Sequence, residues 1–181
     1  MSMNHHPIRR ATAGFTMVEL LVVIIIATTL ALIAAPGWLN FVNSRRAEAG
    51  REQIFQLLRQ AQTQAMRTRQ VQVVDFVTPA DGLPIVRIAG VEQPIDAQVP
   101  SNDDTEMFGL EVLDGDTTGC AGDAAGCVIF NDRGNLQRQD LGEGGVKIVL
   151  TSPKDNEGSR RCVVITSLLG AMQKANGEAC N

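Results

Sequence analysis

Histidine is almost absent from this chain of 181 residues, because its only two copies, His5 and His6, lie close to the N-terminus. Tyrosine is missing, and no Gly-x-Ser-x-Gly, phosphate-binding loop or Cys-x-x-Cys pattern occurs. Hydrolases with a histidine base, P-loop enzymes and zinc fingers depend on such residues at fixed spacings. Acidic turns at 103–104 and 114–116 also lack the pattern of a calcium-binding loop. We therefore expect no catalytic residue, no cofactor and no metal ion.

Charged residues are missing from the whole stretch between Glu19 and Arg45. Residues 20–35 within it are almost wholly apolar, and a run of this length is a candidate membrane-spanning helix. An ordinary secretory signal, cleaved after Ala35, is the alternative interpretation. Pro36 would then be the first mature residue, which is unfavourable, and the Glu19 carboxylate fits such a signal badly.

Basic residues are outnumbered by acidic ones, 16 against 20, and Arg9 and Arg10 fall within the first 14 residues. Without that segment, which holds no acidic residue, 14 basic residues face 20 acidic ones, a net charge of −6. An acidic average argues against a generic nucleic-acid-binding surface, although it leaves room for a local basic patch.

Cysteine occurs only in the C-terminal third, at Cys120, Cys127, Cys162 and Cys180. An even number in a chain that leaves the cytoplasm predicts two disulfides, for which three connectivities exist. We favour pairing between nearest neighbours, Cys120–Cys127 and Cys162–Cys180. Zinc binding is the competing interpretation, and the lack of any histidine after residue 6 argues against it.

The order of patterns predicts one long helix followed by strands. From Phe15 to about Thr68 the chain reads as helical, and beyond the apolar run an amphipathic stripe can pack on a sheet. Pro36 lacks an N–H and predicts a kink. The apolar residues of this packing stripe are Phe41, Ile54, Leu57, Leu58, Ala61, Ala65 and Met66.

Short β-rich segments, bounded by turn residues, follow Gln70. We expect strands over residues 71–77, 85–89, 108–113, 127–130, 146–150 and 162–166, and a polar variable loop over 90–106. One helix followed by a run of strands predicts an α+β fold, with a mainly antiparallel sheet packed against the helix.

Residues 14–21, Gly-Phe-Thr-Met-Val-Glu-Leu-Leu, resemble the processing site of type IV pilins and type II secretion pseudopilins. The resemblance implies that a prepilin peptidase cuts between Gly14 and Phe15 and that the new N-terminal Phe15 is methylated. It also implies that Glu19, the fifth mature residue, pairs with the N-terminal amine of a neighbouring subunit during assembly. Pro36 falls where helices of this family often carry a helix-disrupting proline.

This resemblance divides the chain into four parts. They are a prepilin leader at 1–14, a transmembrane or filament-core helix at 15–36, its amphipathic continuation at 37–69, and a β-rich periplasmic or extracellular domain at 70–181. It implies a single-pass protein of the bacterial inner membrane that later enters a pilus or pseudopilus. The implied partners are the prepilin peptidase, the inner-membrane assembly platform, inner-membrane lipid, and other major and minor pilins or pseudopilins.

Two later segments, residues 127–134 and 161–170, resemble β segments of the GspH/FimT branch, which includes minor pilins of the FimT and FimU type. Some FimT-type minor pilins serve DNA uptake and carry a Gly-Arg-x-Arg motif near the C-terminus. The matching position here starts at Gly170, lacks both arginines and keeps only Lys174. Arg160 and Arg161 lie nearby, before the expected strand. Weak DNA contact by Lys174, Arg160 and Arg161 is therefore a hypothesis that we do not favour.

The leading hypothesis is a minor pilin of the GspH/FimT type, a structural subunit that joins or primes a type IV pilus. The alternative is the equivalent minor pseudopilin H of a type II protein secretion system. A DNA-binding minor pilin for DNA uptake is the third hypothesis, and an anchored envelope enzyme the fourth.

Overall fold

The computed structural model describes residues 14–79, 82–95, 108–114, 118–137, 141, 144–152 and 159–181. By its internal contacts the chain divides into two compact units, Met1–Asn40 and Phe41–Asn181, and helix α1 (Met17–Thr68) contributes to both. The remaining elements all belong to the second unit. They are β1 (Gln72–Val77), β2 (Ile85–Ile88), β3 (Val91–Pro94), β4 (Gly109–Leu113), β5 (Gly126–Phe130), β6 (Val146–Thr151), β7 (Arg161–Ile165), β8 (Met172–Asn176) and the 3-10 turn η2 (Gly177–Cys180).

The first unit holds the N-terminal part of α1, which begins two residues after the predicted start at Phe15. Every residue from Gly14 to Ile33 is exposed. The helix is continuous across position 36, and the kink predicted at Pro36 stays a prediction.

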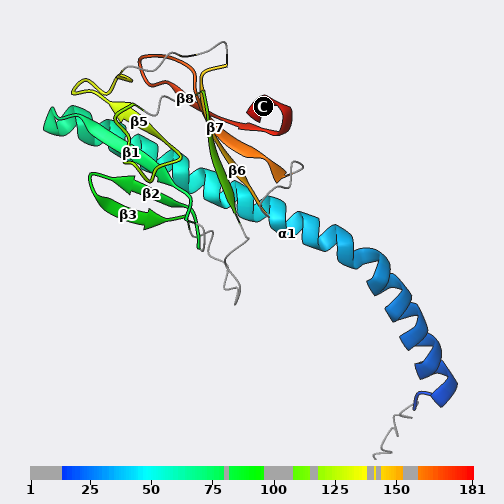
Figure 1. Ribbon diagram of the computed structural model, residues 1–181. Helices are drawn as coiled ribbons and strands as arrows, with labels where there is room; N and C mark the ends of the chain where they lie inside the picture. The colour runs from blue at the N-terminus through cyan, green and yellow to red at the C-terminus, as the bar shows by residue number, and fades with distance from the viewer. Residues whose placement is uncertain are drawn as a thin grey trace, which may run out of the picture. The chain divides into compact units, whose positions relative to one another are not determined.

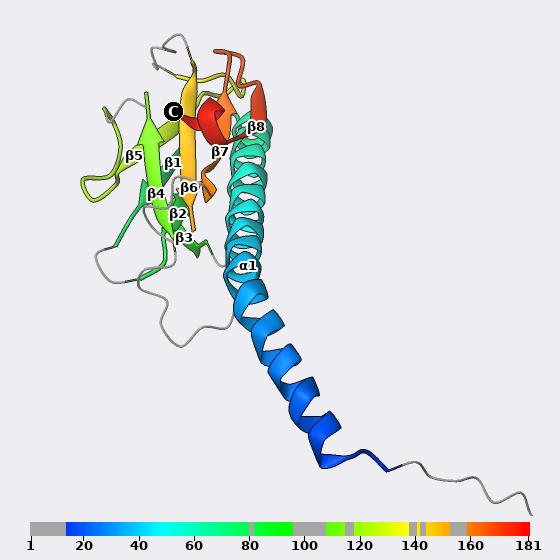
Figure 2. The same ribbon diagram turned by 90° about the vertical axis from the view of Figure 1, so that its right-hand side faces the viewer.

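The second unit contains two antiparallel sheets of four strands each, in the orders β3-β2-β1-β5 and β4-β6-β7-β8. Figures 1 and 2 show the part of α1 after Phe41 running along these sheets. The predicted α+β fold with antiparallel strands on a helix is therefore confirmed, although the strands form two sheets and not one. Residues of both sheets and of α1 share the main apolar core, and Val149, Cys162, Val164 and Cys180 form a second, smaller cluster.

The buried positions of α1 recur at helical spacing and so form one face. They are Ala47, Ile54, Leu57, Leu58, Ala61 and Ala65, which agrees with the central part of the predicted stripe. The prediction was wrong for its two ends, because Phe41 is 52% exposed and Met66 is 47% exposed. The Phe41 ring instead lies 5.2 Å from the Arg45 guanidinium carbon, and Met66 lies over Gly134 at the edge of the core.

All six predicted strands are present with ends that differ by a residue or two, but two further strands escaped prediction. The loop expected over 90–106 was wrong for β3, which pairs with β2 through a two-residue turn at Ala89-Gly90. Both turn residues have positive φ, as tight hairpins require, yet Ala-Gly is a weak turn signal and β3 is polar. Strand β8 contains no β-branched residue and is held as an edge strand by β7.

Candidate processing and assembly site

The proposed scissile bond lies just outside the helix. Gly14, Phe15 and Thr16 have no regular secondary structure, and α1 begins at Met17. A Cβ atom added at Gly14 would meet no atom within 4 Å, so the backbone is open on that side. The peptide bond between Gly14 and Phe15 is therefore not enclosed in helical hydrogen bonds, which leaves it accessible to a peptidase.

Thr16 caps this end of α1. The backbone N–H of Glu19 donates to Thr16 Oγ1 at 3.2 Å, and the N–H of Leu20 donates to the Thr16 carbonyl at 3.1 Å. The first bond satisfies one of the four N–H groups that a helix start leaves open, and the second is the first regular hydrogen bond of the helix. Our sequence reasoning missed Thr16, although Thr-x-x-Glu ahead of an apolar run is a known capping signature.

Glu19 stands in the first turn of α1, where the helix dipole favours a negative charge by about 0.3–1 kcal/mol. No basic group among the described residues forms an ion pair with its carboxylate. The side chain is exposed, so its carboxylate is accessible to a group outside this chain. Its predicted pairing with the amine of a neighbouring subunit stays a prediction.

The apolar part of α1 exposes large side chains along its whole length, between 47% and 78% for the residues that follow Glu19. Thr28 and Thr29 are its only hydroxyl residues between positions 20 and 35. Both hydroxyls donate to carbonyls three and four residues earlier, at 2.8–3.1 Å, so neither is left unsatisfied in apolar surroundings. Among the described residues, no helix meets the combined length and hydropathy needed to cross a membrane.

The disulfide Cys120–Cys127 closes a short loop on the first sheet, as nearest-neighbour pairing predicts. Asp75, the cross-strand partner of Cys127, accepts a hydrogen bond from the Ala121 N–H at 3.1 Å. The Asp75 carboxylate and the two sulfur atoms lie within 4.8 Å of one another. Because the sulfurs are bonded to each other, they offer no thiolate to a metal ion, and we interpret the group as a clamp on the loop.

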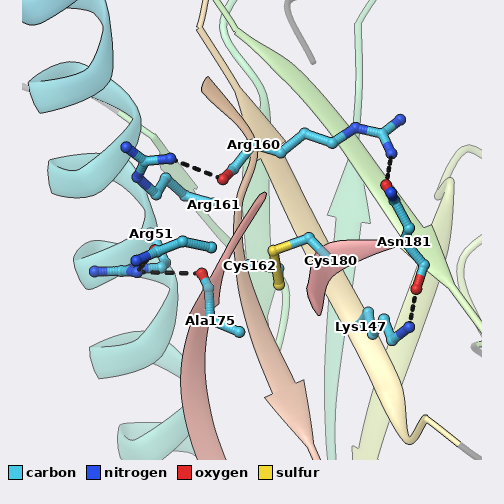
Figure 3. The surroundings of a disulfide bond; sticks show 9 residues. Arg51, Lys147, Arg160, Arg161, Cys162, Ala175, Cys180 and Asn181 are labelled. Atoms are coloured by element: carbon cyan, nitrogen blue, oxygen red, sulfur yellow. Dashed lines mark hydrogen bonds between the residues drawn. A yellow bond between two sulfur atoms is a disulfide. The ribbon is translucent and has the colours of Figure 1, made fainter. Parts of the chain in front are cut away.

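The disulfide Cys162–Cys180 fastens η2 to β7, the second nearest-neighbour pair, as Figure 3 shows. Arg51, a buried residue of α1, donates to the Ala175 carbonyl at 3.2 Å and to the Asn176 side chain. After η2, Lys147 donates to the Asn181 carbonyl, and Arg160 donates to the Asn181 side chain. Sequence reasoning did not single out Arg51, because a lone arginine inside a helical pattern is usually an exposed residue.

The three basic residues considered for DNA contact do not form one patch. Side chains alternate along a strand, and the register of β7 and β8 places Lys174 and Arg161 on the α1 side of the sheet. Lys174 there pairs with Glu52 at 2.8 Å, which lowers the pKa of that carboxyl through its hydrogen bond. Arg160 lies on the opposite side with Asn181, while Arg161 donates to the Arg160 carbonyl at 2.9 Å (Figure 3).

The comparisons with known proteins concern the N-terminal segment. A family model described as prokaryotic N-terminal methylation motif matches residues 9–35. The matched segment contains Gly14, Phe15, Thr16 and Glu19, and it supports a type IV pilin-like or pseudopilin subunit. No curated protein and no solved structure shows significant similarity to the chain.

Proposed function

We propose that this protein is a minor pilin of the GspH/FimT type, a non-enzymatic subunit that joins or primes a type IV pilus. The observation that carries the proposal is the coincidence of the methylation motif with a helix start. The motif covers residues 9–35, and within it α1 begins only after the segment Gly14–Thr16. A peptidase substrate needs its scissile bond outside a helix, and this chain has that arrangement at Gly14–Phe15.

Processing would remove residues 1–14 and leave Phe15 as a methylated N-terminus. Thr16 keeps the cap of α1 intact after cleavage, because its hydroxyl and carbonyl belong to the mature chain. The mature chain therefore starts with one free residue, one capping residue and then helix. Phe15 and Glu19 would then be the first and fifth residues of the mature chain.

Glu19 would then guide docking between subunits. A charged side chain at the centre of a membrane helix costs about 2.5–3.5 kcal/mol, so an unpaired carboxylate near the apolar run favours a cationic partner. The Phe15 amine of a neighbouring subunit supplies such a charge. Pairing of the two would fix the axial register of adjacent helices, while their exposed apolar side chains pack together.

Anchoring in the inner membrane through residues 15–36, with the second unit on the periplasmic side, is part of this proposal. The two disulfides support an oxidising location for the second unit. The N-terminal segment serves a type II secretion pseudopilin equally well, so the minor pseudopilin remains the second candidate. Adjacent genes for other minor pilins favour the pilus, and a secretion operon favours the alternative.

The proposal is tested by incorporation into filaments sheared from cells that produce the full chain. Glu19→Leu removes the charge, and we expect it to reduce the amount in the sheared fraction at least about tenfold, equivalent to about 1.4 kcal/mol. Glu19→Asp keeps the charge and is the matched control, which we expect to incorporate substantially better. Equal incorporation of the wild-type and Glu19→Leu chains would contradict the docking role.

A further inference from the structure

Two leucines occupy the centre of a tight turn on the surface of the second unit. The turn joins β7 to β8, and the Gly170 N–H donates to the Ser167 carbonyl at 2.9 Å. Turn centres favour Gly, Pro, Asn, Asp and Ser, yet Leu168 and Leu169 stand there, 56% and 72% exposed. Leucines in such a place keep much of their apolar surface in water and gain little from burial, so the fold itself does not explain them.

The turn is held firmly in place from both sides. The Leu136 N–H donates to the Leu168 carbonyl at 2.8 Å. From α1, the Gln62 amide donates to the carbonyls of Leu169 at 3.4 Å and Gly170 at 3.3 Å. The same amide donates to the Gly134 carbonyl at 2.9 Å, so one side chain joins two loops to the helix. Figure 2 shows the turn between β7 and β8 beside the C-terminal end of α1.

Met66 extends the apolar surface that the two leucines begin. It lies one helical turn after Gln62, is 47% exposed, and lies against Gly134, where an added Cβ would come within 2.8 Å of its Cγ. Single exposed apolar residues are ordinary on protein surfaces. Here the backbone that carries the two leucines is hydrogen-bonded to Gln62 and Leu136, and Met66 lies over Gly134, which Gln62 also bonds. A backbone that is already ordered loses less entropy when its exposed side chains enter an interface. We call Met66, Leu168 and Leu169 the apolar knob.

Three arginines are close neighbours in sequence of the residues that form and support the apolar knob. Arg59 shares the Gln62–Met66 face by helical spacing, Arg67 follows Met66, and Arg133 precedes Gly134. All three are exposed, and no carboxylate of the described residues forms an ion pair with any of them. The Arg59 guanidinium carbon lies 5.2 Å from the centre of the Phe55 ring, so Arg67 and Arg133 supply the main charge near the knob. Asp132 is an acidic neighbour in sequence. The knob therefore has a cationic rim, although the chain as a whole is acidic, with a net charge of −4.

We propose that the apolar knob docks into an apolar depression, rimmed by carboxylates, on a different protein. Protein interfaces combine an apolar centre with charges at the rim, and complementary charges set partner choice and association rate. Phosphate groups of a nucleic acid would use the arginines but gain nothing from the leucines. A second copy of this chain would bring the same knob and the same rim. The inference goes beyond the proposed function, because it concerns the second unit and holds whether or not Phe15 is methylated.

The test is site-specific photocrosslinking with the full chain in its native cells. Benzoylphenylalanine at Leu169 is the probe, and the same residue at Val91, an apolar position that is 61% exposed on edge strand β3, is the matched control. We expect an adduct at position 169 and none at position 91. The crosslinked peptide of the partner, mapped by mass spectrometry, should be apolar and flanked by Asp or Glu.

Charge reversal then tests the rim. Arg67→Glu combined with Arg133→Glu should reduce the adduct about tenfold, and an Asp→Lys change at the mapped rim of the partner should restore it. An intact Cys162–Cys180 disulfide in each variant shows that the fold is retained. Equal labelling at positions 169 and 91, no adduct, or an adduct with nucleic acid, lipid or a second copy would each overturn the inference. The N-terminal mass of the same sample reports processing separately.

Discussion

Arg87 and Asp123 face each other through two hydrogen bonds, from Nη1 to Oδ1 at 3.0 Å and from Nη2 to Oδ2 at 2.9 Å. Arg87 belongs to β2, and Asp123 belongs to the loop that the Cys120–Cys127 disulfide closes. Arg87 also bonds to Glu92 of β3 at 2.8 Å. This guanidinium therefore connects a hairpin to a loop far along the chain.

The Arg87–Asp123 pair predicts a dependence of loop stability on pH. The hydrogen bonds from Arg87 lower the pKa of the Asp123 carboxyl below its usual value. A carboxyl whose pKa is lowered by folding stabilises the fold fully above its unfolded pKa, about pH 4, and the contribution is lost as pH falls through the lower folded value. We expect the hydrogen-exchange protection of the Ala125 amide, which donates to the Phe76 carbonyl, to fall below about pH 4.

Asp123→Asn is the control for this dependence, because it keeps the shape of the side chain but cannot ionise. Its protection should be lower than that of the wild type at neutral pH and should lack the step in acid. A step of the same size in the Asp123→Asn chain would assign the effect to another group.

Gly50 occupies a position of α1 that has no room for a side chain. A Cβ atom there would clash with Leu150 Cδ2 and lie 3.2 Å from Ile95 Cγ2, and both neighbours are fully buried. Alanine gains about 1 kcal/mol in helix propensity, whereas overpacking a core costs about 1–3 kcal/mol. We expect Gly50→Ala to destabilise the chain by about 1 kcal/mol net, measured by denaturant unfolding in mild detergent.

The matched control is Gly37→Ala, in the same helix, where an added Cβ meets no atom within 4 Å. Helix propensity alone acts there, so this variant should be neutral or more stable by up to about 1 kcal/mol. Stabilisation by both substitutions would show that α1 is not packed closely against Leu150.

The N-cap bond from the Glu19 N–H to the Thr16 hydroxyl should stabilise the start of α1 measurably. Replacing an N-cap threonine by alanine costs about 1 kcal/mol, so Thr16→Ala should increase exchange of the Glu19 and Leu20 amides about fivefold. Thr16→Ser keeps the hydroxyl and should leave the exchange rates close to those of the wild type. Equal rates in all three chains, recorded by NMR of the full chain in micelles, would exclude the cap.

Removal of either disulfide should lower the free energy of unfolding, by amounts that differ between the two bonds. In the chain-entropy account, the Cys162–Cys180 bond, with a separation of 18 residues, contributes about 3 kcal/mol, and the Cys120–Cys127 bond, with a separation of 7, contributes about 2 kcal/mol. The double substitution Cys162→Ala with Cys180→Ala should therefore cost more stability in denaturant unfolding. It should also increase amide exchange in β8, whereas loss of the other bond should leave β8 unaffected. The opposite order would show that β8 does not depend on its disulfide.

The long helix and six strands could be predicted because their local signals agree with the final fold. Helical spacing from Ile54 to Ala65 and alternating β-branched residues are present in the chain itself. Strand β8 depends instead on pairing with β7, on Arg51 and on the Cys162–Cys180 bond, all distant in sequence. Its own residues carry no strand preference, so no local pattern could show it.

The candidate site was predictable for a different reason. Gly14, Phe15 and Glu19 lie within a few residues of one another, so a short sequence motif is enough to identify them. The apolar knob was not predictable, because Met66 is 102 residues away from Leu168 in sequence. Their loops are brought to α1 by long-range hydrogen bonds from Gln62 to Gly134 and Leu169. Met66 has the helical spacing of the buried stripe, but in the structure it lies over Gly134 at the edge of the core and is 47% exposed.

The most direct test of the account is the N-terminus of the mature protein. Intact-mass and N-terminal peptide analysis of the full chain, recovered from membranes and filaments of its native cells, measures both cleavage and methylation. We predict a chain that begins at Phe15 and carries one methyl group on its amine. A chain that retains Met1, or one that begins at Pro36, would contradict it.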